Sequence, residues 1–290
     1  MEKQQQIFGG GVAVITGAGS GIGEGLARHA AAIGMKVVLA DISRARNEAV
    51  AQDIRASGGE ALTVETDVSD PAALDRLAAR VHQHWGDVRL LVNNAGIETI
   101  GFSWELSAAD WERTLGVNIH GVIHGVRAFA PRMIASGKPA FIANVSSIGG
   151  LSMMPLQTSY ILSKHAVLSY SECLSMEMQL INSAVQVSAI LPGLVATRIF
   201  GDASSSATDM AAQHRDLMHG MLRDGGISPR EAASRIFTRI ADGEFWVSTH
   251  PEMTAECARN RAAHLIGLQR PEVTPEMLAI LGKVDEGTNT

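Results

Sequence analysis

Cysteine is scarce in this chain, and its scarcity excludes one class of folds. Among 290 residues only Cys173 and Cys257 are cysteines, and they lie far apart in the sequence. Two such cysteines cannot build the disulfide framework of a small secreted domain. They indicate a protein of the reducing cytoplasm, in which cysteine serves only for packing.

An excess of basic residues and long apolar runs are missing as well. Lysine and arginine number 24 against 30 acidic residues, and the net charge of −6 disfavours a nucleic-acid-binding surface. Residues 1–6 are polar and lack the apolar core of a signal peptide. No uninterrupted apolar run reaches the roughly 20 residues that a membrane span needs. We therefore expect a cytoplasmic protein that binds neither nucleic acid nor membrane.

What the chain does have is a regular alternation of strand and helix patterns over its first 200 residues. This alternation predicts an α/β fold, a doubly wound parallel sheet of the Rossmann type with helices on both faces. A length of 290 residues with 46% hydrophobic content suits one such domain. About seven strands are expected, near residues 12–16, 36–41, 60–66, 88–92, 140–145, 184–190 and 244–248.

The predicted domain spans residues 1–250, and residues 251–290 form a helical extension of it. Between the sixth strand and the next helix, residues 198–226 carry methionines at helical spacing. Two interpretations of this stretch stay open: an ordinary packed helix, or a mobile lid with an apolar inner face.

A glycine-rich turn follows the first strand. The sequence from Gly17 to Gly23 reads GAGSGIG, and a helical pattern comes next. Glycines let the backbone turn sharply and approach a pyrophosphate, which the free N–H groups of the following helix then bind. Asp41 ends the second strand about 20 residues later, where a dinucleotide site has the acid that binds the ribose hydroxyls. This acid would repel a 2′-phosphate, so NAD is expected, although Arg44 and Arg46 would offset part of its charge and leave NADP open.

Tyr160 and Lys164 stand four residues apart in a stretch with helical periodicity. On a helix these two positions lie on the same face. A nearby ammonium stabilises a phenolate and lowers the pKa of the phenol from about 10 towards neutral, where a general acid or base works best. The pair therefore predicts a proton-transfer site.

Further motifs follow in a fixed order. Asp67-Val68 comes after the third strand, Asn94-Ala95-Gly96 after the fourth, and residues 192–197 after the sixth. Ser147 ends the fifth strand and precedes the tyrosine by 13 residues. In order and spacing these motifs resemble the classical short-chain dehydrogenase/reductase family over about residues 10–200. The resemblance implies an oxidoreductase that uses a nicotinamide dinucleotide.

The resemblance also implies roles for individual residues. Tyr160 exchanges the proton of the substrate hydroxyl, and Ser147 hydrogen-bonds the same oxygen. Lys164 lowers the pKa of Tyr160 and holds the nicotinamide ribose, while Asn118 anchors a water that leads protons to solvent. The residues expected to bind the cofactor are Gly17, Ser20, Gly21, Ile22, Gly23, Asp41, Asp67, Val68, Asn94, Ala95, Gly96, Tyr160, Lys164, Pro192, Gly193, Val195 and Thr197.

An apolar loop at residues 149–157 is expected to line the substrate pocket, because it lies between the two catalytic hydroxyl groups. It contains Met153 and Met154, and methionine adapts to irregular apolar shapes. Together with Trp104 and the methionines of residues 198–226, this loop predicts a bulky hydrophobic or aromatic substrate. The residues expected to contact it are Ile97, Ser147, Met153, Met154 and Tyr160.

Residues 116–137 resemble bacterial members of the family that oxidise lignin-derived aryl ether alcohols at the benzylic carbon, and the long C-terminal extension fits that group. The expected reaction is the NAD-dependent interconversion of such a secondary alcohol and its ketone. Steroid or terpenoid alcohols are alternative substrates. A non-catalytic NAD sensor is a further alternative, against which the presence of all four catalytic residues argues.

The assembly expected from the resemblance is a homodimer. The family's usual tetramer is in doubt, because residues 243–251 depart from its glycine-rich seventh strand. The predicted helices at 109–133 and 158–178 carry apolar positions on more than one face and are expected to form the dimer. His120 and His124 lie one turn apart on the first of them, but no acidic third ligand stands nearby in sequence. We expect packing or an interface there, and no metal.

Overall fold

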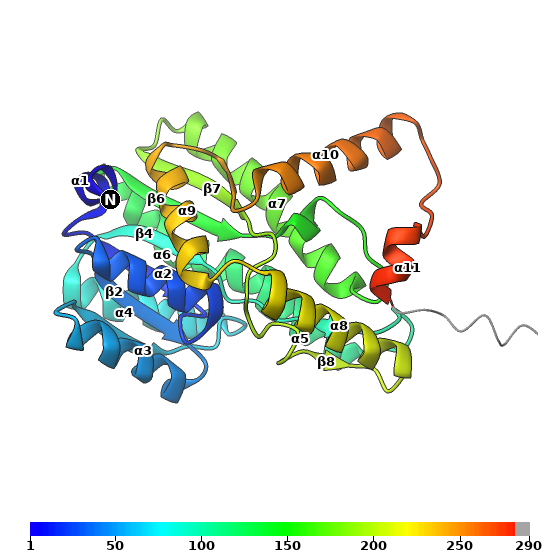
Figure 1. Cartoon of the computed structure of the whole chain (residues 1–290). Helices are drawn as coiled ribbons and strands as arrows, with labels where there is room; N and C mark the ends of the chain where they lie inside the picture. The colour runs from blue at the N-terminus through cyan, green and yellow to red at the C-terminus, as the bar shows by residue number, and fades with distance from the viewer. Residues whose placement is uncertain (282–290) are drawn as a thin grey trace, which may run out of the picture.

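The structure, a computed structural model, describes residues 1–281 and is built on a parallel sheet (Figure 1). Its strands are β1 (Val12–Thr16), β2 (Lys36–Asp41), β3 (Ala61–Glu65), β4 (Val88–Asn93), β6 (Ala140–Val145), β7 (Val185–Leu191) and β9 (Trp246–Ser248). They form one seven-stranded sheet in the order β3-β2-β1-β4-β6-β7-β9, and every neighbouring pair is parallel. The predicted Rossmann-type fold is confirmed, and each strand lies within two residues of its expected bounds.

Helices cover both faces of this sheet (Figure 1). On one face lie α1 (Glu2–Phe8), α2 (Gly21–Ala32), α3 (Arg44–Ala56) and α9 (Pro229–Ala241). On the other lie α4 (Pro71–Trp85), α6 (Gly121–Ala135) and α7 (Thr158–Leu180). Successive strand residues point to opposite faces, so Val14 is buried in one apolar core and Ile15 in the other. The sheet is therefore buried on both sides, as its continuous apolar strands require.

Short polar residues fix where several helices begin. Asp70 accepts a hydrogen bond from the backbone N–H of Ala72 at the start of α4, and Pro71 occupies the first helical position. At the start of α5 (Ala108–Leu115), Ser107 and Asp110 form a reciprocal capping box. These caps satisfy N–H groups that have no partner within their own helix.

The first helix, α1, is absent from the sequence-based prediction, which treats residues 1–6 only as a polar start. It buries Phe8, whose ring meets Phe141 at 5.0 Å and Phe237 at 5.5 Å between centroids, both edge to face. The aromatic contacts anchor a segment whose polar composition hides its single core residue.

The helix expected over residues 109–133 is interrupted. It consists of α5, a π-helical turn at Gly116–His120, and α6. Asn118 lies in the π-helical turn and is fully buried. Such turns often occur at functional sites, because they re-aim a side chain without ending the helix.

The order of the strands reverses between β1 and β4, and parallel sheets bind ligands in the crevice at such a point. The carboxyl ends of both strands meet there. The side-chain amide of Asn94 donates to the carbonyl of Thr16 over 2.8 Å, and its backbone N–H donates to the Thr16 hydroxyl over 2.9 Å. These bonds hold the mouth of the crevice in a fixed shape.

Segments outside the sheet lie over this crevice. The helix α8 (Asp209–Gly225) falls within the stretch for which a helix is predicted. Two strands that the sequence does not predict, β5 (Thr99–Ile100) and β8 (Ser204–Ser205), pair in parallel and tie the segment after β4 to the approach to α8.

The C-terminal extension contains α10 (Pro251–Ile266) and α11 (Pro275–Leu281), while residues 282–290 of the predicted extension lie outside the described residues. The helix α10 buries no residue and projects away from the sheet, and α11 returns towards α8 (Figure 1). The His214 ring lies 3.1 Å from the carbonyl oxygen of Ile280, so α11 is bonded to α8. Within residues 1–281 no helix combines the length and apolar character that crossing a bilayer requires.

Candidate active site

A cavity of about 1270 Å³ occupies the crevice. Its walls come from the glycine turn, from the segments after β2, β3, β4, β6 and β7, and from α5, α7, α8 and α11. A typical small-molecule pocket measures about 300–1,000 Å³. The cavity therefore has room for a dinucleotide and a second molecule side by side.

The glycine turn forms one end of the cavity. Gly17 and Gly21 have positive φ angles of 65° and 55°, which glycine adopts without strain. A Cβ atom on Gly17 would lie 2.9 Å from the Cα of Ala95, so the turn also needs glycine for close packing. The helix α2 begins at Gly21, and its N-cap Ser20 makes no side-chain cap bond, which leaves the first N–H groups for an anion. These features fit the pyrophosphate of a dinucleotide.

Gly23 has a different place from the one predicted. It does not line the cavity, and a Cβ atom there would lie 2.1 Å from the carbonyl oxygen of Gly17. Its lack of a side chain lets α2 pack under the glycine turn. Gly23 supports the turn and does not contact the space for the ligand.

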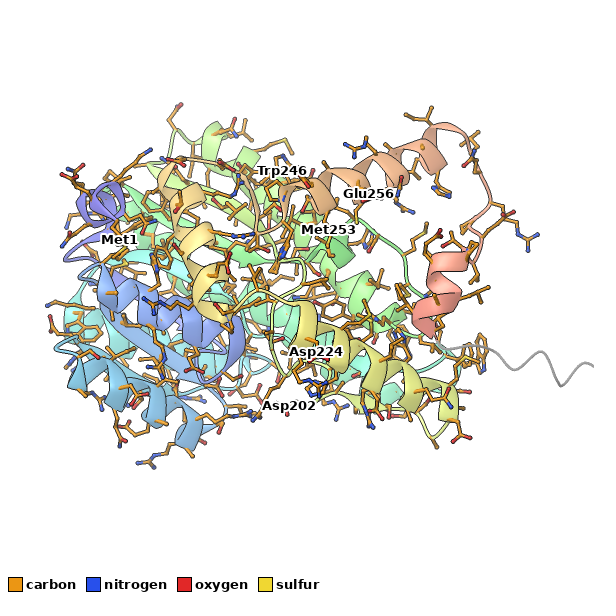
Figure 2. The ribbon with its side chains drawn as sticks, viewed as in Figure 1. Met1, Asp202, Asp224, Trp246, Met253 and Glu256 are labelled. Carbon is orange, nitrogen blue, oxygen red and sulfur yellow. The ribbon has the colours of Figure 1, made fainter. Side chains whose placement is uncertain are left out.

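Asp41 is held in place at the next part of the cavity. One carboxylate oxygen accepts a hydrogen bond from the N–H of Gly19 over 2.9 Å, and the other from the N–H of Ser43 over 2.8 Å. Arg46, expected to offset the charge of Asp41, instead pairs with Asp202 over 3.3 Å. Asp202 lies on the loop before α8 (Figure 2), so the positive charge of Arg46 is shared with an acid.

The remaining residues expected to bind the cofactor lie along the same wall. Those that line the cavity are Ser20, Ile22, Asp67, Val68, Asn94, Ala95, Gly96, Pro192, Gly193, Val195 and Thr197. The backbone N–H of Gly193 donates to the Thr249 hydroxyl over 3.0 Å, which fixes the segment after β7. When bound, a nicotinamide cofactor supplies the hydride acceptor, and its oxidised ring carries a positive charge into the cavity.

The predicted catalytic residues meet at the inner end of the cavity. Ser147, Tyr160 and Lys164 all line it. The Lys164 Nζ lies 5.4 Å from the centroid of the Tyr160 ring and donates to the carbonyl of Val145 over 3.0 Å. The Ser147 Oγ accepts a hydrogen bond from the N–H of Gly149 over 3.0 Å. A substrate oxygen placed between the two hydroxyl groups would face a proton donor and an orienting group at once.

The charges in this site differ from the sequence-based prediction. Burial raises the pKa of Tyr160, the negative charge of Glu98 raises it further, and a hydrogen bond with Ser147 opposes both. Burial also lowers the pKa of Lys164 to about 8, against the charge of Glu98. The predicted lowering of the Tyr160 pKa is therefore wrong for the protein groups alone, because the cost of burying a phenolate, to which the charge of Glu98 adds, exceeds the effect of the hydrogen bond with Ser147.

Asn118 acts as a clamp in the structure. Its side-chain oxygen accepts from the N–H of Ile97 over 2.8 Å, and its NH₂ group donates to the carbonyl of Ile97 and to the hydroxyl of Ser163, each over 3.0 Å. Both N–H bonds are thus used within the protein. Asn118 therefore fixes the segment after β4 against α7, and the water-anchoring role expected for it stays a prediction.

The sequence-based prediction misses Glu98. This residue is only 2% exposed, yet it lines the cavity. One carboxyl oxygen accepts a hydrogen bond from the N–H of Thr99 over 3.1 Å, and the other has no partner among residues 1–281. Burial raises its pKa well above the ordinary value, while the bond from Thr99 and the charge of Lys164 act in the opposite direction. The one signal in the sequence is an acid two residues after the Asn94-Ala95-Gly96 motif.

Apolar side chains form the part of the cavity beyond the catalytic residues. They are Ile97, Ile148, Met154, Ile161, Leu194, Ile199, Phe200, Met218, Met221, Leu222 and Ile280. Two residues expected here lie elsewhere. Met153 contacts the guanidinium of Arg261 over 3.3 Å outside the lining, and Trp104 is 79% exposed and stacks on Phe102. Ile280, which the prediction does not include, reaches the cavity because α11 folds back.

The helix α8 supplies one apolar wall through Met218, Met221 and Leu222. Leu217 on the same helix is 39% exposed and does not line the cavity. The predicted amphipathic helix is therefore present, with its methionines facing inward. That it opens as a lid stays a prediction.

Comparison with known proteins identifies the family. The family model described as short chain dehydrogenase matches residues 11–208. The chain belongs to the short-chain dehydrogenase family. It is 31% identical over 252 residues to a CLA biosynthesis dehydrogenase/reductase of Lactiplantibacillus plantarum. The matched region covers 83% of this chain and 88% of that relative. The predicted family is confirmed, and the chain is an oxidoreductase whose cofactor is a nicotinamide dinucleotide.

Solved structures of this family agree with the fold over nearly the whole chain. A short-chain dehydrogenase/reductase from Burkholderia phymatum in complex with NAD is 37% identical, with a TM-score of 0.87 over 92% of this chain and 98% of that one. The apo form of LigD from Sphingobium sp. strain SYK-6 is 28% identical, with a TM-score of 0.75 over 91% and 100%. The second likeness extends beyond the region that the family model matches.

Proposed function

We propose that this short-chain dehydrogenase is an NAD-dependent enzyme that interconverts a bulky aromatic secondary alcohol and its ketone. The observation that carries the proposal is the meeting of Ser147, Tyr160 and Lys164 between a glycine turn and an apolar wall in one cavity. In the oxidative direction Tyr160 removes the proton of the substrate hydroxyl. Ser147 orients that oxygen, and Lys164 stabilises the negative charge on the phenol.

The preference for NAD over NADP rests on Asp41. Its carboxylate is fixed by two backbone N–H groups beside the glycine turn, where a ribose would lie. A phosphate on that ribose would meet a negative charge, and like charges brought together cost several kcal/mol. Arg46 lines the same cavity, but its pairing with Asp202 reduces the share of the Asp41 charge that it offsets. The NAD bound by the relative from B. phymatum agrees with this assignment.

Substituting Asp41→Ala is expected to lower the ratio of kcat/KM for NAD to that for NADP by about 10²-fold, because the repulsion of a 2′-phosphate is removed. Steady-state rates with each cofactor at one substrate concentration give the ratio. Asp67→Ala is the matched control, since Asp67 is a second acid of the same cavity, follows the neighbouring strand β3, and should change both cofactors alike. An unchanged ratio in Asp41→Ala would remove this role.

For the substrate, we propose the benzylic alcohol of a lignin-derived aryl ether. The apolar wall formed by Met154, Phe200, Met218 and Met221 suits an aromatic molecule of some length. The likeness to LigD, which covers 91% of this chain, supports this choice. Steroid or terpenoid alcohols fit the same wall and are the competing candidates.

The test is a rate measurement by NADH absorbance with NAD and a panel of aryl ether, steroid and terpenoid secondary alcohols. We expect the aryl ether alcohol to be turned over fastest. Activity on steroids or terpenoids alone would keep the reaction and discard the substrate. Cofactor binding without turnover of any alcohol would favour an NAD sensor over an enzyme.

The cytoplasmic location and the homodimer stay predictions. Apolar side chains that are exposed on α7, Met176 and Leu180, support an association of two chains through this helix. The π-helical turn between α5 and α6 interrupts the helix predicted over residues 109–133, so α7 is the better candidate for the centre of the dimer.

A further inference from the structure

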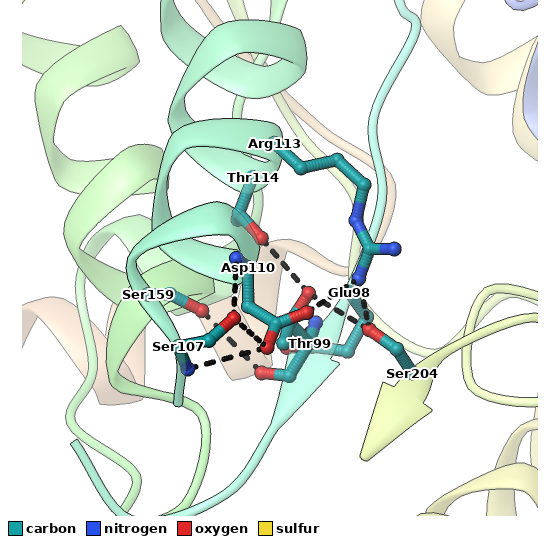
Figure 3. A network of polar contacts seen from close by, with 8 residues as sticks. All are labelled: Glu98, Thr99, Ser107, Asp110, Arg113, Thr114, Ser159 and Ser204. Atoms are coloured by element: carbon teal, nitrogen blue, oxygen red, sulfur yellow. Dashed lines mark hydrogen bonds and ion pairs between the residues drawn. The ribbon is translucent and has the colours of Figure 1, made fainter. Parts of the chain in front are cut away.

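Glu98 is a buried carboxyl group beside the catalytic residues, and the reaction described above does not use it. Its backbone is fixed on both sides. Asn118 binds both the N–H and the carbonyl of Ile97, and the Thr99 hydroxyl lies 2.8 Å from that of Thr114 on α5 (Figure 3). Two residues before Glu98, a Cβ atom on Gly96 would lie 3.4 Å from the Lys164 Nζ. The segment that carries Glu98 therefore passes directly by the catalytic ammonium.

The carboxyl group itself is poorly satisfied. One oxygen accepts a single N–H bond, and the other is buried without a partner among residues 1–281. A structural carboxylate of this burial is ordinarily paired with a cation or bonded on both oxygens. An acid left in this state is a candidate for a group that holds or releases a proton during the reaction.

Few charged groups surround Glu98. From α7, Lys164 and Tyr160 share the cavity with it, and the charge of Glu98 acts on both. From α5, Glu112 and Arg113 also line the cavity. The Arg113 guanidinium is half-exposed and binds the Ser204 hydroxyl and the Asp110 carboxylate (Figure 3), so it is already paired. Lys164 is thus the cation that Glu98 can balance.

We propose that Glu98 is a positioning residue that sets the net charge of the Tyr160–Lys164 pair, and with it the pH range in which each direction of the reaction runs. The inference rests on the proposed alcohol–ketone chemistry. With Glu98 protonated, the Lys164 charge acts alone on the phenol and favours the phenolate that oxidation needs. With Glu98 ionised, the two charges cancel and Tyr160 keeps the proton that ketone reduction needs.

The experiment uses the fact that the chain has only two tyrosines. The second, Tyr170, has a pKa raised by burial to about 12, and Tyr170→Phe leaves Tyr160 as the only phenol. In that background, with NAD bound, the ultraviolet phenolate band is followed against pH. Glu98→Gln keeps the shape and removes the charge, and it should lower the apparent pKa of Tyr160 by about one unit. The pH profile of kcat/KM for oxidation should shift by the same amount.

Glu98→Asp is the conservative variant and keeps the carboxyl group. It should leave the Tyr160 pKa closer to the wild-type value than Glu98→Gln does. A phenolate titration that is unchanged in Glu98→Gln overturns the proposal, as does an equal shift in both variants, since that would show an effect of shape. The titration needs no turnover, so it stays readable even if no alcohol is oxidised and the proposed function fails.

If Glu98→Gln fails to bind NAD, the ionisation of Glu98 is measured instead in the wild-type protein, by the infrared band of its protonated carboxyl group. The proposal requires that this band disappear below the pH at which the Tyr160 phenolate appears, so that Glu98 is ionised while Tyr160 still holds its proton. A carboxyl band that persists until the phenolate has formed overturns the proposal without any variant.

Discussion

Substituting Tyr160→Phe is expected to reduce kcat by about 10²–10⁴-fold, the range that one general acid or base contributes. The ring that lines the cavity is kept, and only the hydroxyl that exchanges the substrate proton is lost. Cofactor affinity should change little, because the glycine turn and Asp41 are untouched. Steady-state rates with the best alcohol of the panel give kcat, and calorimetric titration with NAD gives the affinity.

The matched control for this change is Tyr170→Phe, which removes the only other phenol from the same helix. Tyr170 packs against the apolar core away from the cavity and should leave kcat within about twofold. If Tyr160→Phe kept activity close to that of the control, the acid–base role would be lost. A Tyr160→Phe variant that also failed to bind NAD would instead point to a collapsed site.

The sheet could be predicted because its determinants are local. Each strand is a short apolar run between turn residues, and a parallel sheet buried on both faces needs such runs. The strands β5 and β8 escaped prediction because two residues carry no periodicity. The helix α1 escaped because Phe8 finds its aromatic partners only in the folded chain.

The catalytic residues could be predicted because their spacing is a property of the sequence. The orientation of side chains in an irregular loop is not, and so Met153 points to Arg261 while its neighbour Met154 lines the cavity. Ile280 reaches the same cavity from α11, and no motif near it in the sequence indicates that this helix folds back over the cavity. Glu98 was missed because a lone acid is ordinarily exposed, and its burial is decided by packing.

The pKa values of Tyr160 and Lys164 could not be predicted from the spacing of the two residues. The sequence shows that a cation stands one turn from Tyr160, which lowers the pKa of a phenol in water. It does not show how far the two groups are removed from water. Here desolvation dominates for both: it raises the pKa of Tyr160 and lowers that of Lys164 to about 8. The charged lysine is therefore held in the site at a cost to stability.

The cost of burying the Lys164 charge leads to the second prediction with a large expected effect. Lys164→Met should lower kcat/KM by about 10²-fold or more, because the charge that stabilises the phenolate is gone. The same change should make the protein more stable at neutral pH. The pKa of Lys164 falls from 10.5 to about 8 on folding, which corresponds to about 3 kcal/mol. Loss of the hydrogen bond to Val145 costs about 1 kcal/mol of stability. The free energy of unfolding is therefore expected to rise by about 2 kcal/mol in the variant.

The gain must depend on pH in one direction. Below pH 8 the folded wild-type protein holds the buried charge, and the advantage of Lys164→Met is complete. Between pH 8 and 10.5 the unfolded chain binds a proton that the folded state has released, so wild-type stability rises with pH and the advantage shrinks. Urea unfolding at pH 7 and pH 10 measures both values. Lys138→Met, at an exposed lysine, is the control and should change neither by more than about 0.5 kcal/mol. A variant that was less stable than the wild type at pH 7 would show that Lys164 holds the fold together through its contacts, and that its buried charge is not a burden.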